Sequence, residues 1–150
     1  MNPYLATPLE MGPVVMSRLL QRISPADLDA ETGEGRFTIR EVIAHLADWE
    51  PILRARIERV RDEPGWTVEA FDEGRMAIEN GYASQSVEEA MATWKEERAR
   101  TAVIVRNLTN KDLLNPYNHP ERGEEHLFDL VASIVGHDMY HLDQVSEFIA

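Results

Sequence analysis

Cysteine is absent from this sequence of 150 residues. The chain therefore has no disulfide and no thiol of its own that could serve as a nucleophile or a metal ligand. Any sulfur chemistry would use a thiol supplied from outside the protein. The absence also fits a reducing compartment, and the N-terminus lacks a basic region followed by an apolar core, so we expect a cytoplasmic protein.

Positive charge and long apolar runs are also scarce. Asp and Glu number 27 against 15 Lys and Arg, which gives a net charge of -12 at pH 7. Such a chain repels phosphate backbones, and no apolar run approaches the length that spans a bilayer, so we expect neither nucleic acid nor a membrane as a partner. A small-molecule partner is expected instead. The length is that of one domain, residues 1–150, which is large enough to bury a core.

Alternation of polar and apolar residues long enough for a strand is lacking, whereas helical patterns are present. At three of the expected helix starts a Ser or Thr stands three residues before a Glu, which is the capping-box pattern that begins helices. These pairs are Thr7 and Glu10, Thr38 and Glu41, and Ser86 and Glu89. We expect helices from Pro8 to about Ile23, from near Ile39 to before Pro64, from Ser86 to between Asn107 and Asn110, and from Glu124 or Glu125 onward.

Four helices of this length predict an all-α four-helix bundle. The connection between the second and third helices, residues 64–85, is long enough to cross the bundle. This long crossover allows those two helices to run parallel, and we expect a short helix within it at about residues 72–80.

Two histidines lie on the apolar stripe of the last expected helix, whose sequence is LFDLVASIVGHDMYHLDQVSEFI. Read in sevens, the stripe has one row of Leu127, Ile134, His141 and Phe148 and a second row of Leu130, His137 and Gln144. The two imidazoles are one helical turn apart and point into the expected core. They either hydrogen-bond a backbone carbonyl or bind a divalent metal, and their spacing alone supplies only half of a coordination sphere.

A third histidine, His45, lies at the edge of the apolar stripe of the second helix, within FTIREVIAHLADWE. It is either a half-exposed polar residue or points along the seam between helices toward the other pair. The segments IREVIAHLADWE and VGHDMYHLDQV resemble those of the DinB/YfiT-like superfamily, a group of small bacterial four-helix proteins. The resemblance implies a DinB-like bundle over the whole chain and a divalent metal, commonly zinc or nickel, bound by His45, His137 and His141.

Other polar residues near these motifs have open roles. Asp48, one turn after His45, either accepts an N–H from a ligand ring or occupies an open coordination position. Gln144 either faces the site, where it lines the pocket or bonds to a metal-bound ligand, or is a buried amide bonded to a neighbouring helix. We expect surface, cap or loop positions outside the metal site for Asp138, Asp143, His119 and His126. No catalytic or cofactor-binding residue is assigned from the sequence.

Three neutral imidazoles would leave a divalent ion its full charge and an open position, which is the pattern of a catalytic site. Characterised members of the superfamily include transferases and isomerases that use low-molecular-weight thiols such as bacillithiol, mycothiol or glutathione. The resemblance therefore implies a metal-dependent thiol S-transferase, in which the metal activates the thiol for attack on an electrophile.

Two alternatives to thiol transfer stay open. One is a metal-hydroxide hydrolase of small esters or amides, although HDMYH lacks the Glu that HExxH supplies as a general base. The other is a non-catalytic metal-binding protein of the stress response, as a monomer or a homodimer.

Overall fold

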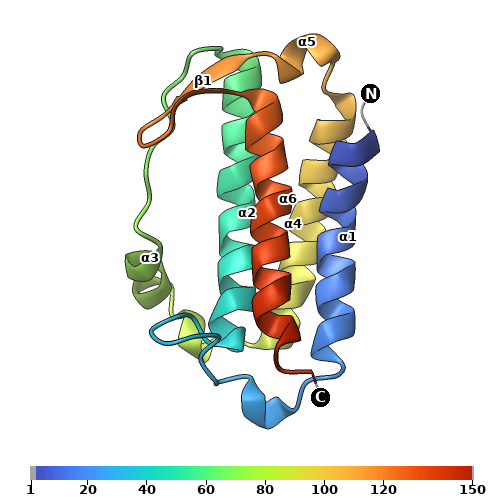
Figure 1. Ribbon diagram of the computed structural model, residues 1–150, viewed down its shortest axis with the longest axis vertical. Helices are drawn as coiled ribbons and strands as arrows, with labels where there is room; N and C mark the ends of the chain where they lie inside the picture. The colour runs from blue at the N-terminus through green and yellow to red at the C-terminus, as the bar shows by residue number, and fades with distance from the viewer. Residues whose placement is uncertain (1–2, 150) are drawn as a thin grey trace.

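Four long helices form the body of the molecule. The computed structural model describes residues 3–149, and its long helices are α1 (Pro3–Leu20), α2 (Ile39–Asp62), α4 (Val87–Asn107) and α6 (Leu127–Ser146). They lie side by side along the long axis (Figure 1). The predicted four-helix bundle is therefore confirmed. None of the described helices is both long and apolar enough to cross a membrane.

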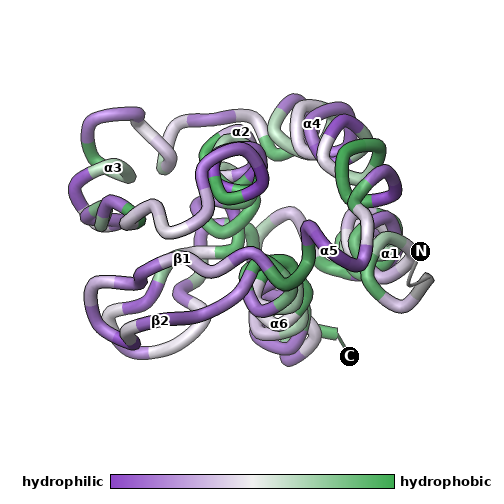
Figure 2. Tube along the Cα trace, turned by 90° about the horizontal axis from the view of Figure 1, so that it is seen from above, coloured by the Kyte–Doolittle hydropathy of each residue, from purple (hydrophilic) through white to green (hydrophobic). Residues whose placement is uncertain are grey.

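The smaller elements lie in the connections between the long helices. They are the 3₁₀ turns η1 (Pro25–Asp27) and η2 (Tyr82–Ser84), the short helices α3 (Glu73–Glu79) and α5 (Asn110–Leu113), and the strands β1 (Pro116–His119) and β2 (Gly123–His126). The two strands pair antiparallel as a hairpin that the sequence pattern does not predict, because four residues per strand are too few to show alternation. Seen along the bundle, α3 and the hairpin lie on one side, beside α2 and α6 (Figure 2).

The course of the chain explains the long crossover. In Figure 1, α1 and α6 run downward whereas α2 and α4 run upward, so α2 and α4 are parallel. The segment between them returns the chain to the other end of the bundle and carries α3, close to the short helix expected at residues 72–80. Asp72 caps α3 by accepting the N–H of Arg75 at 3.0 Å. Both expectations for this segment are confirmed.

Local hydrogen bonds set the starts of α2 and α4. The Thr38 hydroxyl accepts the N–H of Glu41 at 3.2 Å, and the Glu41 carboxylate accepts the N–H of Thr38 at 3.3 Å, which completes the capping box. The Ser86 hydroxyl accepts the N–H of Glu89 at 3.2 Å. Both helices therefore begin where the sequence predicts.

The predicted start of the first helix is wrong, because Thr7 lies inside α1 and not at its cap. Leu5 and Ala6 are only 6% and 2% exposed, so their packing against the core extends the helix toward the N-terminus. The helix also ends at Leu20, earlier than predicted. The last helix begins at Leu127, later than predicted, because β2 occupies the preceding residues.

The interior between the helices contains two apolar clusters separated by charge. Members of one cluster include Leu9, Ile57, Val105 and Ile134, and members of the other include Met16, Ile43, Trp94 and Val145. Between these positions along α2, α4 and α6 lie Glu50, Arg98 and Asp138, which are only 1%, 2% and 3% exposed. The charged residues therefore sit at mid-height of the bundle.

Arg98 bridges the two carboxylates. It donates two hydrogen bonds to Glu50, at 2.7 and 2.8 Å, and one to each oxygen of Asp138, of which that to Oδ1 measures 2.9 Å. A further one reaches the Leu9 carbonyl of α1 at 2.8 Å. Burial works against its charge, but the bonds to Asp138 and Glu50 outweigh burial and raise the pKa of Arg98. The expectation that Asp138 is a surface charge is therefore wrong.

Close approach of α1 is part of the same arrangement. A Cβ placed on Gly12 would collide with the carboxylate of Asp138, and it would also approach Arg98 Nη1 to 3.2 Å. Glycine at this position allows α1 to lie directly against the charged cluster.

The first testable prediction concerns Arg98. The substitution Arg98→Met leaves two buried carboxylates without a cation, so we expect the free energy of unfolding to fall by about 3–5 kcal/mol. Urea denaturation measures this loss. The control Arg100→Met removes an exposed arginine from the same helix and should change stability by no more than about 0.5 kcal/mol. Equal effects of the two substitutions would contradict the assigned role of Arg98.

Candidate metal centre

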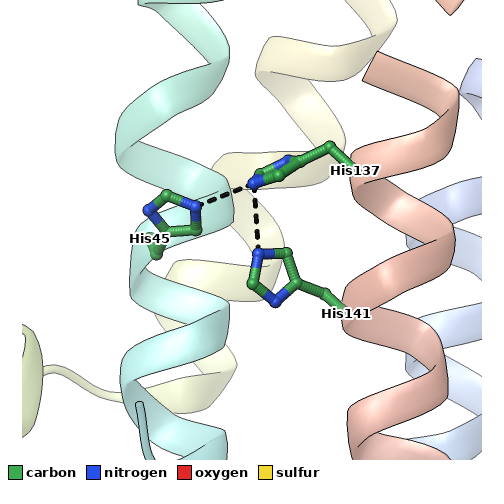
Figure 3. Close-up of side chains that lie close together, drawn as sticks. All are labelled: His45, His137 and His141. Atoms are coloured by element: carbon green, nitrogen blue, oxygen red, sulfur yellow. Dashed lines mark hydrogen bonds between the residues drawn. The ribbon is translucent and has the colours of Figure 1, made fainter. Parts of the chain in front are cut away.

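The three histidines singled out in the sequence meet between α2 and α6. His45 points from α2 toward His137 and His141 on α6 (Figure 3). The Nε2 atom of His137 lies 3.0 Å from Nε2 of His45 and 3.1 Å from Nε2 of His141. All three ligand atoms lie within 4.8 Å of one another. The structure thus brings together residues that are 92 positions apart in the chain.

Aromatic side chains surround the His45 ring. Its centroid lies 5.5 Å from that of Phe37, 5.7 Å from Trp49 and 6.5 Å from Tyr82. His45 is only 1% exposed, so the alternative of a half-exposed polar residue is wrong. The aromatic wall closes the site on the side of α2 and fixes the direction in which His45 points.

The hydrogen-bond geometry tests whether these residues suit a metal. The side-chain oxygen of Gln144 lies 2.9 Å from His141 Nδ1, which must carry the proton in that pair, so Nε2 of a neutral His141 is a bare lone pair. His137 Nε2 would then have to donate its proton to two acceptors at once. His45 Nδ1 would be left protonated, and it is buried without a hydrogen-bond partner among the described residues.

A cation removes most of this conflict, because it accepts the lone pairs of all three Nε2 atoms. Zinc–nitrogen bonds of about 2.0–2.1 Å at tetrahedral angles separate two ligand nitrogens by about 3.3 Å. The observed separations of 3.0 and 3.1 Å are close to that value. The donor set therefore fits a divalent metal ion held by three imidazoles.

The histidines are also in the protonation state that binds metal. Burial lowers the pKa of His45 to about 2 and that of His137 to about 4, and repulsion from neighbouring rings adds to both shifts. Burial also lowers the pKa of His141, against the opposing effect of its bond to Gln144. All three rings are therefore neutral near pH 7, as ligation requires.

Two cavities meet at the histidine cluster. A cleft of about 370 Å³ runs between α2, α6, the hairpin and the segment that precedes α3, and a smaller cavity of about 240 Å³ lies toward Tyr140 and His141. His137 and Glu73 line both cavities. His137 is thus reached from both cavities and His141 from the smaller one, whereas His45 lies buried behind them.

Sequence reasoning did not identify the polar residues of the larger cleft. Glu73 and Arg56 line it, and so does His119, which was expected to be a solvated loop residue. Burial raises the pKa of Glu73, and the positive charge of Arg56 partly offsets that shift. Only the fold brings the crossover segment and the hairpin to this face, so no local pattern could have indicated these residues.

Of the other polar residues considered in the sequence, Gln144 bonds to the histidine cluster and Asp48 does not. Asp48 does not bond to a ligand ring but accepts hydrogen bonds from the Tyr82 hydroxyl at 2.6 Å and from the Asn80 amide at 2.8 Å. Gln144 bonds to His141, which is the first of the two roles left open for it. His126 is the N-cap residue of α6, and Asp143 is exposed, both as expected.

Comparison with known proteins identifies the family. The model of the DinB superfamily matches residues 9–145, so the chain belongs to the DinB superfamily. Among its relatives, "Putative metal-dependent hydrolase YfiT" from Bacillus subtilis is 22% identical over 142 residues, which cover 93% of this chain and 79% of the relative. A protein from Bacillus licheniformis, also named as a putative metal-dependent hydrolase, is 24% identical over 140 residues. The match covers 91% of this chain and 78% of that protein.

Solved structures agree with this assignment. YfiT from Bacillus subtilis superposes with a TM-score of 0.89 at 20% identity, covering 97% of this chain and 83% of that one. The four-helix bundle protein TT2238 superposes with a TM-score of 0.65 at 24% identity, covering 94% of both chains. The predicted resemblance to the DinB/YfiT-like superfamily is confirmed, and the cluster of His45, His137 and His141 fits a metal-dependent enzyme.

The low pKa values predict how the metal-free protein responds to acid. Unfolded histidines have a pKa of about 6.5, whereas His45 and His137 in the fold have values of about 2 and 4. Below about pH 6.5 the unfolded chain binds more protons than the folded chain. The free energy of unfolding therefore has its full value above that pH and falls as the pH decreases. We expect each ring to contribute a slope of up to about 1.4 kcal/mol per pH unit.

Urea unfolding of the metal-free protein between pH 7 and 5 measures this slope. The variant His45→Phe lacks one titrating ring and should show a shallower dependence, whereas His126→Ala should keep the wild-type dependence because His126 is half exposed. A stability that does not change over this range would show that the rings are not buried in neutral form.

Metal content provides the direct test of the cluster. We expect one divalent ion per chain in the wild type and its loss from both His45→Ala and His141→Ala, because each substitution removes one of three ligands. The loss of affinity should exceed the roughly 10–100-fold effect of an outer-shell change. Elemental analysis measures the content, and His126→Ala is the control that keeps the metal. Retention of the metal by either variant would show that the three histidines do not share one metal site.

Proposed function

We propose that this protein is a metal-dependent enzyme that joins a low-molecular-weight thiol to a small electrophilic molecule. His45, His137 and His141 hold the cation, for which zinc and nickel are the candidates. The observation that carries the proposal is the meeting of two cavities at the histidine cluster, with His137 lining both. Two separate compartments suit a reaction of two substrates better than the hydrolysis of one.

The residues of the chain determine what such a site can do. Three neutral imidazoles contribute no negative charge, so a bound divalent cation keeps its full attraction for an anion and lowers the pKa of a thiol or a water molecule beside it. The sulfur must come from an external thiol, because the chain contains no cysteine. The aromatic residues around His45 exclude water from one side of the site.

Glu73 supplies the proton acceptor that the sequence motif lacks. It lines both cavities together with His137, and partial burial raises the pKa of its carboxyl group, which makes the carboxylate a stronger proton acceptor. We assign to Glu73 the removal of the proton from the incoming thiol. This role needs no movement of the bundle, because α3 already places the residue at the junction of the cavities.

Hydrolysis of small esters or amides is the second candidate. Two observations favour it: Glu73 could equally accept a proton from water, and the relatives from Bacillus are named as putative metal-dependent hydrolases. The two candidates differ in their nucleophile and share the metal site and the base.

An assay of two reactions distinguishes the candidates. The metal-loaded protein is supplied with bacillithiol, mycothiol or glutathione and the general electrophile 1-chloro-2,4-dinitrobenzene, and separately with p-nitrophenyl acetate in the absence of thiol. Thiol transfer predicts adduct formation that chelators abolish. Turnover of the ester without thiol, together with no adduct from any thiol, would replace transfer with hydrolysis.

The role of Glu73 has its own test. We expect Glu73→Gln to lower kcat by about 10²–10⁴-fold, because the amide cannot accept a proton, and to remove the acidic limb of the pH–rate profile. Metal content should stay unchanged. The control Glu79→Gln alters an exposed residue of the same helix that pairs with Arg75 and should keep wild-type kinetics. Full activity of the Glu73 variant would exclude it as the base.

A further inference from the structure

Arg56 is a cation in the cleft that forms no ion pair with a carboxylate of the described residues. It lies on α2 and lines the larger cleft together with Trp49, Phe71 and His137. Among residues 3–149, no carboxylate oxygen lies within the ion-pair distance of 4.0 Å from its guanidinium, although Glu69, Glu73 and Glu121 line the same cleft.

Aromatic packing holds the Arg56 side chain in place. Its guanidinium carbon lies 5.5 Å from the ring centroids of both Trp49 and Phe71, and one N–H donates to the Glu69 carbonyl at 2.7 Å. This arrangement fixes the planar group through contacts with its faces and one edge. Because a guanidinium carries five N–H donors, most of them remain available to a ligand.

The second arginine of the cleft wall differs in this respect. Arg122 donates to both oxygens of Glu125, at 2.5 and 3.0 Å, so its charge is already neutralised. Partial burial lowers the pKa of Arg56, and the nearby charges of Glu69 and Glu73 oppose that shift. A partly desolvated guanidinium with free N–H groups favours a hydrogen-bonded anion.

Arg56 is also close enough to the histidines for one small molecule to reach both. The His45 and Trp49 rings are 5.7 Å apart, and Trp49 and the Arg56 guanidinium carbon are 5.5 Å apart. The guanidinium is therefore no farther from the His45 ring than the sum of these spacings. Leu53, Leu130 and Ile134 add apolar wall to the same cleft.

We propose that Arg56 binds a carboxylate of the small molecule that enters the cleft and thereby directs the other end of that molecule toward the three histidines. The inference rests on the proposed function only in taking this cleft as the substrate site. It defines the substrate class: a short, partly apolar carboxylic acid whose reacting group lies at the opposite end from the acid. A bidentate pair between guanidinium and carboxylate fixes orientation as well as affinity.

A matched pair of probes tests the proposal without any reaction. 3-Phenylpropionate and its neutral analogue 3-phenylpropionamide have the same ring and chain length, and isothermal titration calorimetry measures the binding of each to metal-free protein. We expect the wild type to bind the acid about tenfold more tightly than the amide, because a hydrogen-bonded charge pair forms only with the acid. Arg56→Gln should bind both probes equally.

The control replaces an arginine that matches Arg56 in its helix, its charge and its contact with an aromatic ring. Arg59→Gln removes an arginine of α2 that packs 5.4 Å from the Trp66 ring and pairs with Glu63, and that does not line this cleft. This variant should keep the tenfold preference. Thermal unfolding of both variants shows whether a lost preference reflects binding or folding, and Arg56→Lys should restore part of it, since lysine keeps the charge without the planar fork.

The outcomes separate this inference from the proposed reaction. Failure of the adduct assay with a preserved, Arg56-dependent preference for the acid would remove only the reaction. A wild type that shows no preference, or that binds neither probe, would overturn the role of Arg56. A folded Arg56→Gln variant that still prefers the acid to the amide would also overturn it.

Discussion

The buried contact of Arg98 with Glu50 and Asp138 is the constraint on which the rest of the structure depends. Removing charges from water costs several kcal/mol per ion, and this cost is offset only where each group finds its partners in good geometry. The contact joins α2, α4 and α6 and reaches α1 through the Leu9 carbonyl. Any rotation or sliding of one helix would leave a buried charge unpaired.

This constraint also sets the histidine geometry. Asp138 follows His137 directly, and Glu50 follows His45 by little more than one turn of α2. The charged cluster therefore fixes the rotation of both helices at the height where the imidazoles meet. We interpret it as the element that keeps the His137 nitrogen about 3 Å from those of His45 and His141, while the rest of the core is apolar packing.

The sequence contains enough information for the bundle and for the three histidines, but not for the cleft. Helical periodicity places His137 and His141 inward, and the capping box at Thr38 fixes the phase of α2 around His45. The periodicity of the last helix does not indicate that Asp138 is buried. Because α6 contacts helices on more than one side, a residue about 100° away from His137 faces α1 and α4 and not solvent. Glu73 and Arg56 acquire their surroundings from tertiary structure alone.

The parallel course of α2 and α4 has a consequence for diversification within the family. The chain must return along the whole bundle between them, and this excursion, residues 63–86, lies beside the histidines and carries Phe71 and Glu73. Apart from the buried Val68, Ala77 and Tyr82, its residues are partly or fully exposed, so much of its composition can vary while the scaffold stays intact. A change in this one segment can thereby alter which molecules the cleft admits without rebuilding the four helices.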